Sequence, residues 1–355
     1  MAEAMTTEMK HLLDLAIEKG ASDLHITVGV QPMLRVDGKL FPLTDATATT
    51  AETAERLLMS IMTAEQVERL HQRRELDFSF GYQKTRFRTN AFYQKGNIGA
   101  ALRLIPVLVK SMEELGVPPI LERFTEPSQG FVVITGPTGH GKSTTLAALI
   151  ESINEKRADH IITIEDPIEY VFEHKKSIIV QREVGSDTNS FSRALRSALR
   201  EDPNVILVGE MRDLETIEAA LTLAETGHLV FTTLHTNSAS QTADRMIDVF
   251  PPHQQQQVRM QLANVLLGVI SQRLLPRVQG GRVLATEIMV ANSAVRNTIR
   301  EGKTHQLPNI IQTSASEGMI ALDKVLAELV SRGEITIDIA LQWALDPKAF
   351  KMMVY

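Results

Sequence analysis

The chain has 355 residues, of which 43% are hydrophobic and 23% are charged. This length suggests two or three domains, and the composition predicts globular folding and excludes global disorder. The formal net charge of −6 argues against a protein that coats nucleic acid through bulk charge, although it leaves room for a local basic channel. The absence of cysteine excludes disulfides, thiolate zinc sites and a cysteine nucleophile, and it fits a reducing compartment.

The N-terminal segment carries acidic residues and spaced apolar residues, whereas a signal peptide needs a basic segment and a continuous apolar one. No apolar run approaches the ~18 residues that suggest a membrane span. We therefore expect a cytoplasmic protein that does not insert into a membrane and that reaches one only through a partner.

Residues 1–105 predict a small antiparallel α+β domain. Apolar residues along 8–19 share one helical face, and the glycine that follows is a natural helix end. A second helical pattern covers residues 51–74. Strand-like runs occur at residues 24–28, 33–36, 78–82, 87–93 and 100–105, and Asp37-Gly38 is a hairpin signal.

Residues 106–120 contain three prolines and a glycine, which predicts an interdomain hinge. From residue 121 to 355 strands alternate with helices, and buried apolar strands are expected at 131–135, 161–164, 205–208 and 229–233. Such strands separated by helices indicate the α/β class, with a mostly parallel sheet covered on both faces. Residues 255–272 predict an amphipathic helix, and the last ~80 residues have helical patterns.

The segment GPTGHGKST, residues 136–144, follows an apolar strand and opens a predicted helix. In that setting the spacing of Gly136, Gly141, Lys142 and Ser143 predicts a phosphate-binding loop, and the alternative is a glycine-rich turn that matches by chance. Backbone N–H groups and the helix N-terminus attract phosphate oxygens, Lys142 reaches the β- and γ-phosphates, and Ser143 can ligate Mg²⁺. We therefore expect ATP and Mg²⁺ as ligands. The candidate nucleotide contacts in this loop are Gly136, Thr138, Gly139, His140, Gly141, Lys142, Ser143 and Thr144.

Carboxylates follow two of the predicted strands. Glu210 ends the run VILVGE, where a carboxylate can orient or deprotonate an attacking water beside the loop. Glu165, Asp166 and Glu169 form a second acidic cluster at another strand end, and Glu165 is the strongest candidate for a role near the metal or the water. A structural or solvated carboxylate is the alternative for each of these residues.

Histidines and arginines supply further candidates. His228 and His235 flank one predicted strand, so both need not face the nucleotide. His235, at the carboxyl end, is the stronger candidate for a γ-phosphate contact, and a structural histidine is the alternative at both positions. Arg88 and Arg103 lie on strands of the first domain, and an arginine supplied across an interface accelerates phosphoryl transfer by roughly 10³–10⁵.

Together these motifs resemble the secretion-type ATPases of the type IV pilus class over nearly the whole chain. ASDLHI at residues 21–26 resembles that family's N-terminal signature, GPTGHGKST its Walker A loop, and ITIEDPIEY its Asp box. VILVGEMRD resembles its atypical Walker B motif, and GHLVFTTLHT resembles its His box. AVRNTIRE at residues 294–301 resembles a C-terminal segment associated with pilus retraction.

The resemblance implies a PAS-like N-terminal domain, a RecA-like P-loop ATPase domain, and a homo-hexameric ring with nucleotide between the domains. It implies Glu210 as the catalytic glutamate, with Arg88 and Arg103 as arginine contributors. The implied function is ATP-driven retraction of type IV pili at the cytoplasmic face of the inner membrane. The ring would act through a membrane platform protein, and on pilin only indirectly.

This sequence departs from the family pattern at a few positions. His140 stands where the family usually has a small residue, which predicts altered loop contacts. Val295 and Thr298 replace an isoleucine and a leucine in the C-terminal segment. Gly209 stands where most P-loop ATPases have an aspartate, a feature that the family shares and that gives Ser143 and the Asp box more weight in binding Mg²⁺.

Three other functions compete with retraction. Pilus-assembly and type II secretion ATPases typically carry an additional N-terminal domain and a four-cysteine metal-binding insertion, whereas this phosphate loop begins at residue 136 and cysteine is absent. A RecA-like nucleic-acid translocase is disfavoured, because aromatic residues make up only 5% and no strip of aromatic and basic residues is visible. A nucleotide-binding switch without turnover is disfavoured by Glu210 and the histidines.

Overall fold

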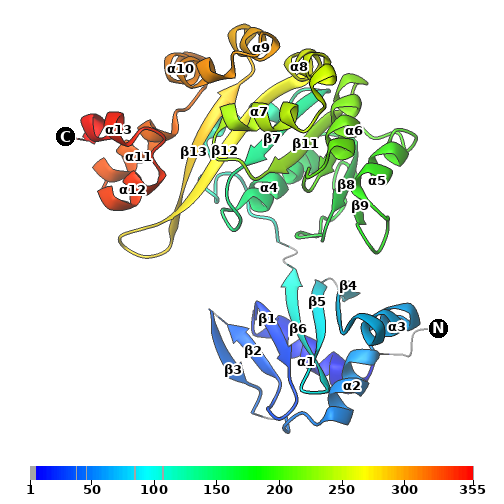
Figure 1. Ribbon diagram of the computed structural model, residues 1–355. Helices are drawn as coiled ribbons and strands as arrows, with labels where there is room; N and C mark the ends of the chain where they lie inside the picture. The colour runs from blue at the N-terminus through cyan, green and yellow to red at the C-terminus, as the bar shows by residue number, and fades with distance from the viewer. Residues whose placement is uncertain (1–4, 37, 45, 84, 106–107, 355) are drawn as a thin grey trace. The chain divides into compact units, whose positions relative to one another are not determined.

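The computed structural model describes residues 5–36, 38–44, 46–83, 85–105 and 108–354. The chain divides into two compact units (Figure 1). The first comprises Met1–Leu108 and Pro167–Val171, and the second comprises Val109–Asp166 and Phe172–Tyr355. Residues 106 and 107 of the predicted hinge lie outside the described residues.

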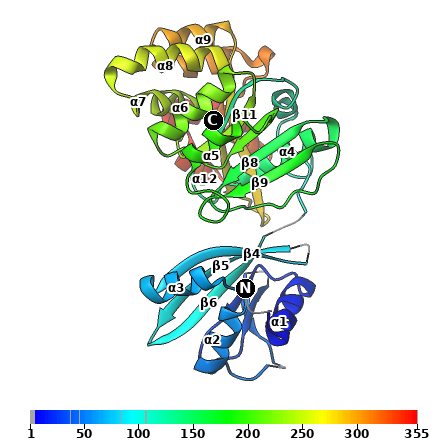
Figure 2. The same ribbon diagram turned by 90° about the vertical axis from the view of Figure 1, so that its right-hand side faces the viewer.

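The first unit consists of an antiparallel sheet with three helices, which are labelled from two directions in Figures 1 and 2. Its strand order is β3-β2-β1-β6-β5-β4. The strands are β1 (Asp23–Ile26), β2 (Met33–Val36), β3 (Lys39–Pro42), β4 (Glu75–Tyr82), β5 (Thr85–Gln94) and β6 (Asn97–Ile105). The helices are α1 (Thr7–Glu18), α2 (Ala51–Met59) and α3 (Ala64–Arg73). The predicted α+β character of this part of the chain is confirmed.

Local sequence explains these elements. The Thr6 side chain accepts a hydrogen bond from Met9 N and begins α1, and Gly20 follows its end with a φ of 59°. The helical pattern at residues 51–74 is two helices, because Thr63 and Gln66 form a capping box that starts α3. The predicted hairpin signal lies between β2 and β3, which form an antiparallel pair. The sequence analysis did not predict the strand β3. Asp37 lies outside the described residues.

The second unit contains a seven-stranded sheet in the order β13-β12-β7-β11-β10-β8-β9. Its strands are β7 (Gly130–Thr135), β8 (His160–Glu165), β9 (Ile178–Glu183), β10 (Val205–Val208), β11 (Leu229–Leu234), β12 (Leu266–Pro276) and β13 (Arg282–Val290). Neighbouring strands pair in parallel, except that β13 runs antiparallel to β12. The predicted mostly parallel sheet is confirmed.

Alternate residues of the buried strands face opposite layers of helices. Phe131 and Val133 of β7 belong to a core that includes residues of α5 (Phe191–Ala198), α6 (Leu214–Glu225), α7 (Ala239–Asp248), α8 (Pro252–Val265) and α9 (Ser293–Arg300). The helix α4 (Lys142–Lys156) contributes no residue to that core, yet it contacts β7 and β11. Helices therefore cover both faces of the sheet, as predicted for this class.

Two predictions for the C-terminal third of the chain are wrong in part. The expected helix 255–272 ends at Val265, and the apolar run that follows enters the sheet as β12. Periodicity could not separate the two, because a continuous apolar run suits a buried strand and a buried helix equally. Within the last ~80 residues, β13 forms a strand, and the rest is largely helical.

The C-terminal helices form a separate small core with the far ends of β12 and β13, which includes Leu275, Ala285 and Phe350. The remaining helices of the second unit are η1 (Pro119–Phe124), η2 (Thr304–Gln306), α10 (Leu307–Thr313), η3 (Ala315–Glu317), α11 (Leu322–Ser331), α12 (Ile337–Trp343) and α13 (Pro347–Val354). Among the residues with a described structure, no helix combines the length and the apolar character that crossing a bilayer requires.

Candidate nucleotide site

The candidate site residues gather where four neighbouring parallel strands end. In the sheet, β7, β11, β10 and β8 are adjacent. The phosphate loop follows β7, His235 follows β11, Glu210 follows β10, and Glu165 is the last residue of β8. The carboxyl edge of an open α/β sheet is where such folds bind ligands, so the residues singled out from the sequence converge for a topological reason.

The phosphate loop has the strand–loop–helix setting that its sequence predicted. Gly136 has a φ of 143°, and a Cβ there would lie 2.4 Å from the carbonyl oxygen of Gln272, so only glycine fits. Gly141 has a φ of 80° and caps α4. The backbone N–H groups in the first turn of α4 have no helical acceptor, which makes this turn suited to phosphate oxygens. Thr138 and Gly139 are exposed at the tip of the loop, and Ser143 is half-buried.

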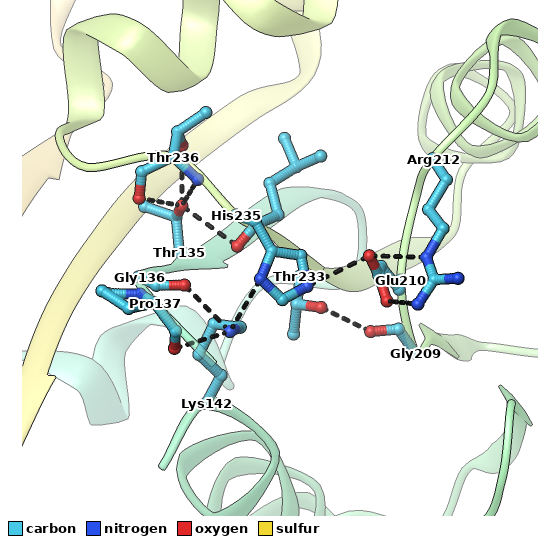
Figure 3. A network of polar contacts seen from close by, with 11 residues as sticks. Thr135, Gly136, Pro137, Lys142, Gly209, Glu210, Arg212, Thr233, His235 and Thr236 are labelled. Carbon is cyan, nitrogen blue, oxygen red and sulfur yellow. Dashed lines mark hydrogen bonds and ion pairs between the residues drawn. The ribbon is translucent and has the colours of Figure 1, made fainter. Parts of the chain in front are cut away.

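Lys142 is buried against its own loop. Its Nζ donates to the carbonyl oxygens of Gly136 at 2.9 Å and Pro137 at 3.0 Å, and it lies 3.5 Å from Nδ1 of His235 (Figure 3). The ammonium group is therefore held at the loop by weak neutral acceptors. A phosphate oxygen in the loop would be a stronger, charged acceptor for the same group.

His235 connects Lys142 to a carboxylate. Its Nε2 lies 3.1 Å from Oε1 of Glu210, so one imidazole bridges the loop lysine and the strand-end glutamate (Figure 3). Arg212 holds the same carboxylate from the other side, through Nε to Oε1 at 2.8 Å and Nη2 to Oε2 at 2.9 Å. The structure thus brings Lys142, His235 and Glu210 together as predicted neighbours, and it adds Arg212.

The electrostatics of Glu210 favour its ionised form. Burial raises its pKa, but the hydrogen bonds from Arg212 and the positive charges of His235, Arg212 and Lys142 hold the pKa below its ordinary value. A carboxylate with a lowered pKa orients a water well and removes its proton weakly. The side chain is 21% exposed, so a water can reach it.

Glu165 lies deeper in the site. Its carboxylate accepts a hydrogen bond from Thr163 Oγ1 at 2.6 Å and one from Gln181 Nε2 at 3.4 Å. Gly209 packs against it, because a Cβ on Gly209 would lie 3.3 Å from the Cα of Glu165. An aspartate at position 209 would therefore crowd the end of β8. Asp166 is exposed just beyond that end.

Magnesium has suitable oxygen donors here. The described residues contain no cluster of three acidic or histidine side chains that could hold a metal ion by itself. Mg²⁺ in nucleotide enzymes usually takes only one or two protein oxygens, together with phosphate oxygens and waters. The hydroxyl of Ser143 and the carboxylate of Glu165 are oxygen ligands of the kind that Mg²⁺ prefers, so the residues present fit the ion.

The remaining candidates are His228, at the other edge of the same sheet, and Arg88 and Arg103, which belong to the first unit. His228 precedes β11, at the amino edge of the sheet, where its carbonyl accepts from Gly130 N and its Nδ1 lies 2.8 Å from the carbonyl oxygen of Leu223. His228 therefore lies at the opposite edge of the sheet from the phosphate loop, and its nucleotide contact stays a prediction. Arg88 and Arg103 face each other across β5 and β6 in the first unit, and Arg103 Nε donates to Asp23 Oδ1 at 2.9 Å.

The sequence analysis missed Arg212 and the residues of β12 that touch the loop. Arg212 had a usable signal, because residues two apart in extended chain lie on the same side and it follows Glu210 at that spacing. Gln272 donates through Nε2 to the carbonyl oxygen of His140 at 2.7 Å, and the backbone N–H of Leu274 donates to Nδ1 of His140 at 3.0 Å. These contacts were missed because residues 266–272 were assigned to a helix.

Known proteins resemble this chain over most of its length. Residues 2–280 match the family model described as type II/IV secretion system protein. The type IV pilus retractation ATPase PilT of Pseudomonas aeruginosa is 49% identical, over 97% of this chain and 100% of that protein. A twitching motility protein of Neisseria gonorrhoeae is 50% identical, over 90% of this chain and 85% of that protein.

Solved structures agree with these matches. The crystal structure of the pilus retraction motor PilT with bound ADP superposes with a TM-score of 0.90 at 49% identity, covering 97% of this chain and 98% of that one. The ATPase DotB of Legionella pneumophila superposes with a TM-score of 0.84 at 28% identity, covering 96% of this chain and 98% of that one. The resemblance drawn from the motifs is therefore confirmed, and so is the predicted fold class. This chain belongs to the type II/IV secretion system protein family, and within it the chain is an ATPase.

Proposed function

We propose that this chain is the ATP-hydrolysing motor that retracts type IV pili, and that it works as a homo-hexamer. The observation that carries the proposal is the 49% identity, over 97% of this chain, to a protein described as a type IV pilus retractation ATPase. The arrangement of Lys142, His235 and Glu210 around one sheet edge supports the chemical half of the proposal, because it supplies a phosphate contact and a water-orienting carboxylate.

In the proposed reaction, ATP replaces the loop carbonyls as the partner of Lys142. The ammonium group turns from Gly136 and Pro137 to the β- and γ-phosphates, while the first turn of α4 binds phosphate oxygens through backbone N–H groups. Ser143, with Glu165 close to the metal or its water, would hold Mg²⁺, whose charge neutralises the phosphates. His235 contacts the γ-phosphate from its position between Lys142 and Glu210.

Glu210 orients the attacking water in this proposal. Water attacks the γ-phosphorus, the bond to the β,γ-bridging oxygen breaks, and the proton of the water passes to the phosphate being released or to Glu210. Because Arg212 holds both oxygens of Glu210, that ion pair must loosen for one oxygen to meet the water. Glu210 therefore acts chiefly by position, as its lowered pKa suggests.

Further parts of the proposal concern assembly. Arg88 and Arg103 serve the nucleotide of a neighbouring subunit, and residues 106–120 act as a hinge that converts hydrolysis into relative movement of the two units. The ring acts on a platform protein of the inner membrane from the cytoplasmic face, and it acts on pilin only indirectly. Complementation between inactive variants measures the contribution of the arginines across subunits.

The decisive experiment is a deletion in the host followed by a count of surface pili. Retraction predicts more pili, none of which retract, and complementation with Glu210→Gln should leave that phenotype unchanged although the purified variant still binds ATP. Complementation with Glu218→Gln, which alters an exposed carboxylate on α6, should restore normal pili. A deletion strain without surface pili would instead establish the rival function of pilus assembly.

A further inference from the structure

His140 fixes the phosphate loop to the neighbouring strand β12. Its carbonyl oxygen accepts from Gln272 Nε2 at 2.7 Å, and its ring nitrogen Nδ1 accepts from the backbone N–H of Leu274 at 3.0 Å. Its ring also meets Trp343 edge to face, with ring centroids 5.2 Å apart and an interplanar angle of 64°. One loop residue is thus tied to a strand and to the last residue of α12.

The end of β7 explains why a loop side chain can reach β12. The pairing of β7 with β12 stops at Thr135 and Ser271, whereas β12 continues to Pro276. Past Ser271 the phosphate loop replaces β7 along this edge of β12. The ring of His140 then accepts the strand N–H of Leu274, three residues past the last position that pairs with β7.

The imidazole of His140 is suited to this contact only when it is neutral. Burial lowers its pKa, and the nearby charges of Arg273, Lys142 and Arg282 lower it further. The N–H of Leu274 donates to Nδ1, so in the neutral ring the proton is on Nε2. The side chain therefore serves as a fixed acceptor beneath the loop.

Trp343 contacts the phosphate loop directly and the segment after β11 through Arg273. Besides the ring of His140, it contacts the guanidinium of Arg273, which lies 5.4 Å from the indole centroid. Arg273 in turn donates through Nη2 to the carbonyl oxygen of Asn237 at 2.6 Å, two residues after His235. A shift of the loop or of the segment after β11 therefore reaches the same indole.

The indole is also connected to the helices beyond it. Asp323, in the first turn of α11, accepts hydrogen bonds from Leu345 N at 2.7 Å and Asp346 N at 3.0 Å. These two residues lie between α12 and α13, so a displacement of Trp343 bears on the segment that joins these helices and on its contact with α11. These helices share one small core with the ends of β12 and β13.

The polar side chains between the loop and Trp343 are costly for stability. Gln272 and Arg273 are almost fully buried, and neither Gln272 Oε1 nor Arg273 Nε has a hydrogen-bond partner among the described residues. Leaving a buried polar atom unsatisfied destabilises a fold, and an apolar strand would avoid this cost. Buried polar atoms without a hydrogen-bond partner occur mainly at functional positions.

We propose that His140 couples nucleotide in the phosphate loop to the C-terminal helices α11–α13 through Trp343. In this role His140 is a positioning residue: filling the loop displaces its backbone, and the contacts with Leu274 and Trp343 carry that displacement to α12. The inference rests on nucleotide binding at the loop and does not require pilus retraction. Because coupling is reciprocal, a change at Trp343 must alter the affinity of the loop for nucleotide.

Trp343 is the single tryptophan of the chain, so its fluorescence reports this contact directly. We would titrate the purified full-length chain with ADP and Mg²⁺ and follow indole emission, with binding measured in parallel by calorimetry. We expect a saturable emission change in the wild type. In His140→Ser the emission change should be lost, while calorimetry reports the ADP affinity of the same variant, and His253→Ser, at an exposed histidine on α8, should behave as the wild type.

The reciprocal measurement uses Trp343 itself. Trp343→Ala should change the dissociation constant for ADP by about 2- to 10-fold, the range expected for one aromatic pair, and Trp343→Phe should restore most of the wild-type value. If the indole had only a structural role, Trp343→Ala would lose thermal stability, and Trp343→Phe would not restore the affinity for ADP. If His140→Ser no longer binds ADP, this second measurement decides the question.

Two results overturn the inference. One is ADP binding to the wild type with no change in indole emission, and the other is a Trp343→Ala chain with wild-type ADP affinity. A wild-type chain that binds no nucleotide would overturn both this inference and the proposed motor function. Nucleotide binding without coupling overturns the inference alone.

Discussion

The two sides of the phosphate loop differ in chemistry. On the side of β10 and β11, His235 is 42% exposed and Glu210 is 21% exposed, and their charges are open to water and substrate. On the side of β12 and β13, Gln272, Arg273 and Glu287 are almost completely buried. Exposed groups can exchange partners during a reaction, whereas buried groups keep theirs. The proposed hydrolysis therefore belongs to the first side, and the proposed transmission of movement belongs to the second.

The largest expected effect tests whether a second copy of the chain contributes an arginine to the open side of the loop, which is the side of β10 and β11. Arg103→Ala and Lys142→Ala should each reduce ATP turnover about 10³-fold or more, because one removes an arginine that we propose acts in trans and the other removes the loop lysine. Mixed rings should regain part of the activity, since some sites combine an intact loop with an intact arginine. Phosphate release from mixtures at several ratios measures this.

The control for the mixing experiment is each inactive variant mixed with itself. Arg103 also pairs with Asp23, so thermal unfolding of Arg103→Ala must first match that of the wild type. Arg88→Ala, on the strand opposite, should follow the same pattern. No recovery at any ratio would count against action in trans and would leave the open side to be completed within the chain.

An effect of intermediate size is expected at Arg212. Arg212→Ala removes two hydrogen bonds and a positive charge from Glu210, so the pKa of Glu210 should rise. The carboxylate is then lost at a higher pH, and the acid limb of kcat/KM should move upward by about one pH unit. Arg212→Lys keeps the charge and should move the limb less. An acid limb that does not move in Arg212→Ala would remove Glu210 from the groups that set it.

The smallest effect concerns the buried side. Burial raises the pKa of Glu287 from 4.5 to about 7, although the N–H of Ala239 and the charge of Arg273 oppose this. The folded chain thus holds a proton that the unfolded chain releases between pH 4.5 and 7. The protonated Glu287 therefore contributes to the free energy of unfolding in full below about pH 4.5, and this contribution is lost as the pH rises through about 7.

Glu287→Gln should abolish this loss. From pH 5.5 to 8 the free energy of unfolding of the wild type should fall by about 1–3 kcal/mol more than that of Glu287→Gln. Urea denaturation followed by the emission of Trp343, which lies in the same unit, measures the difference. Asp244→Asn, a partly exposed carboxylate on α7, is the matched control and should keep the wild-type pH dependence. Equal slopes for wild type and Glu287→Gln would show that Glu287 is ionised throughout.

Local sequence determined the chemistry on the open side. The spacing from Gly136 to Ser143 predicted the loop, and the positions of Glu210 and His235 just after β10 and β11 predicted that each lies near it. The physical reason is that neighbouring parallel strands end at one edge, so a residue placed at a strand end is placed at the site. Arg212 shares this logic and could have been found by it.

On the buried side, the side of β12 and β13, only the tertiary structure decided which residues form strands and which side chains meet. Residues 266–270 carry a continuous apolar run, which has no period that separates strand from helix. The position of this segment between β7 and β13 makes it part of β12. His140 meets Leu274 and Trp343 across more than 130 positions, a juxtaposition that no local pattern encodes. The place of His228 was decided in the same way, since it lies just before β11 whereas His235 lies just after it, and its nucleotide contact stays a prediction. Sequence fixes which groups a chain carries at its strand ends, and long-range packing decides which distant groups they touch.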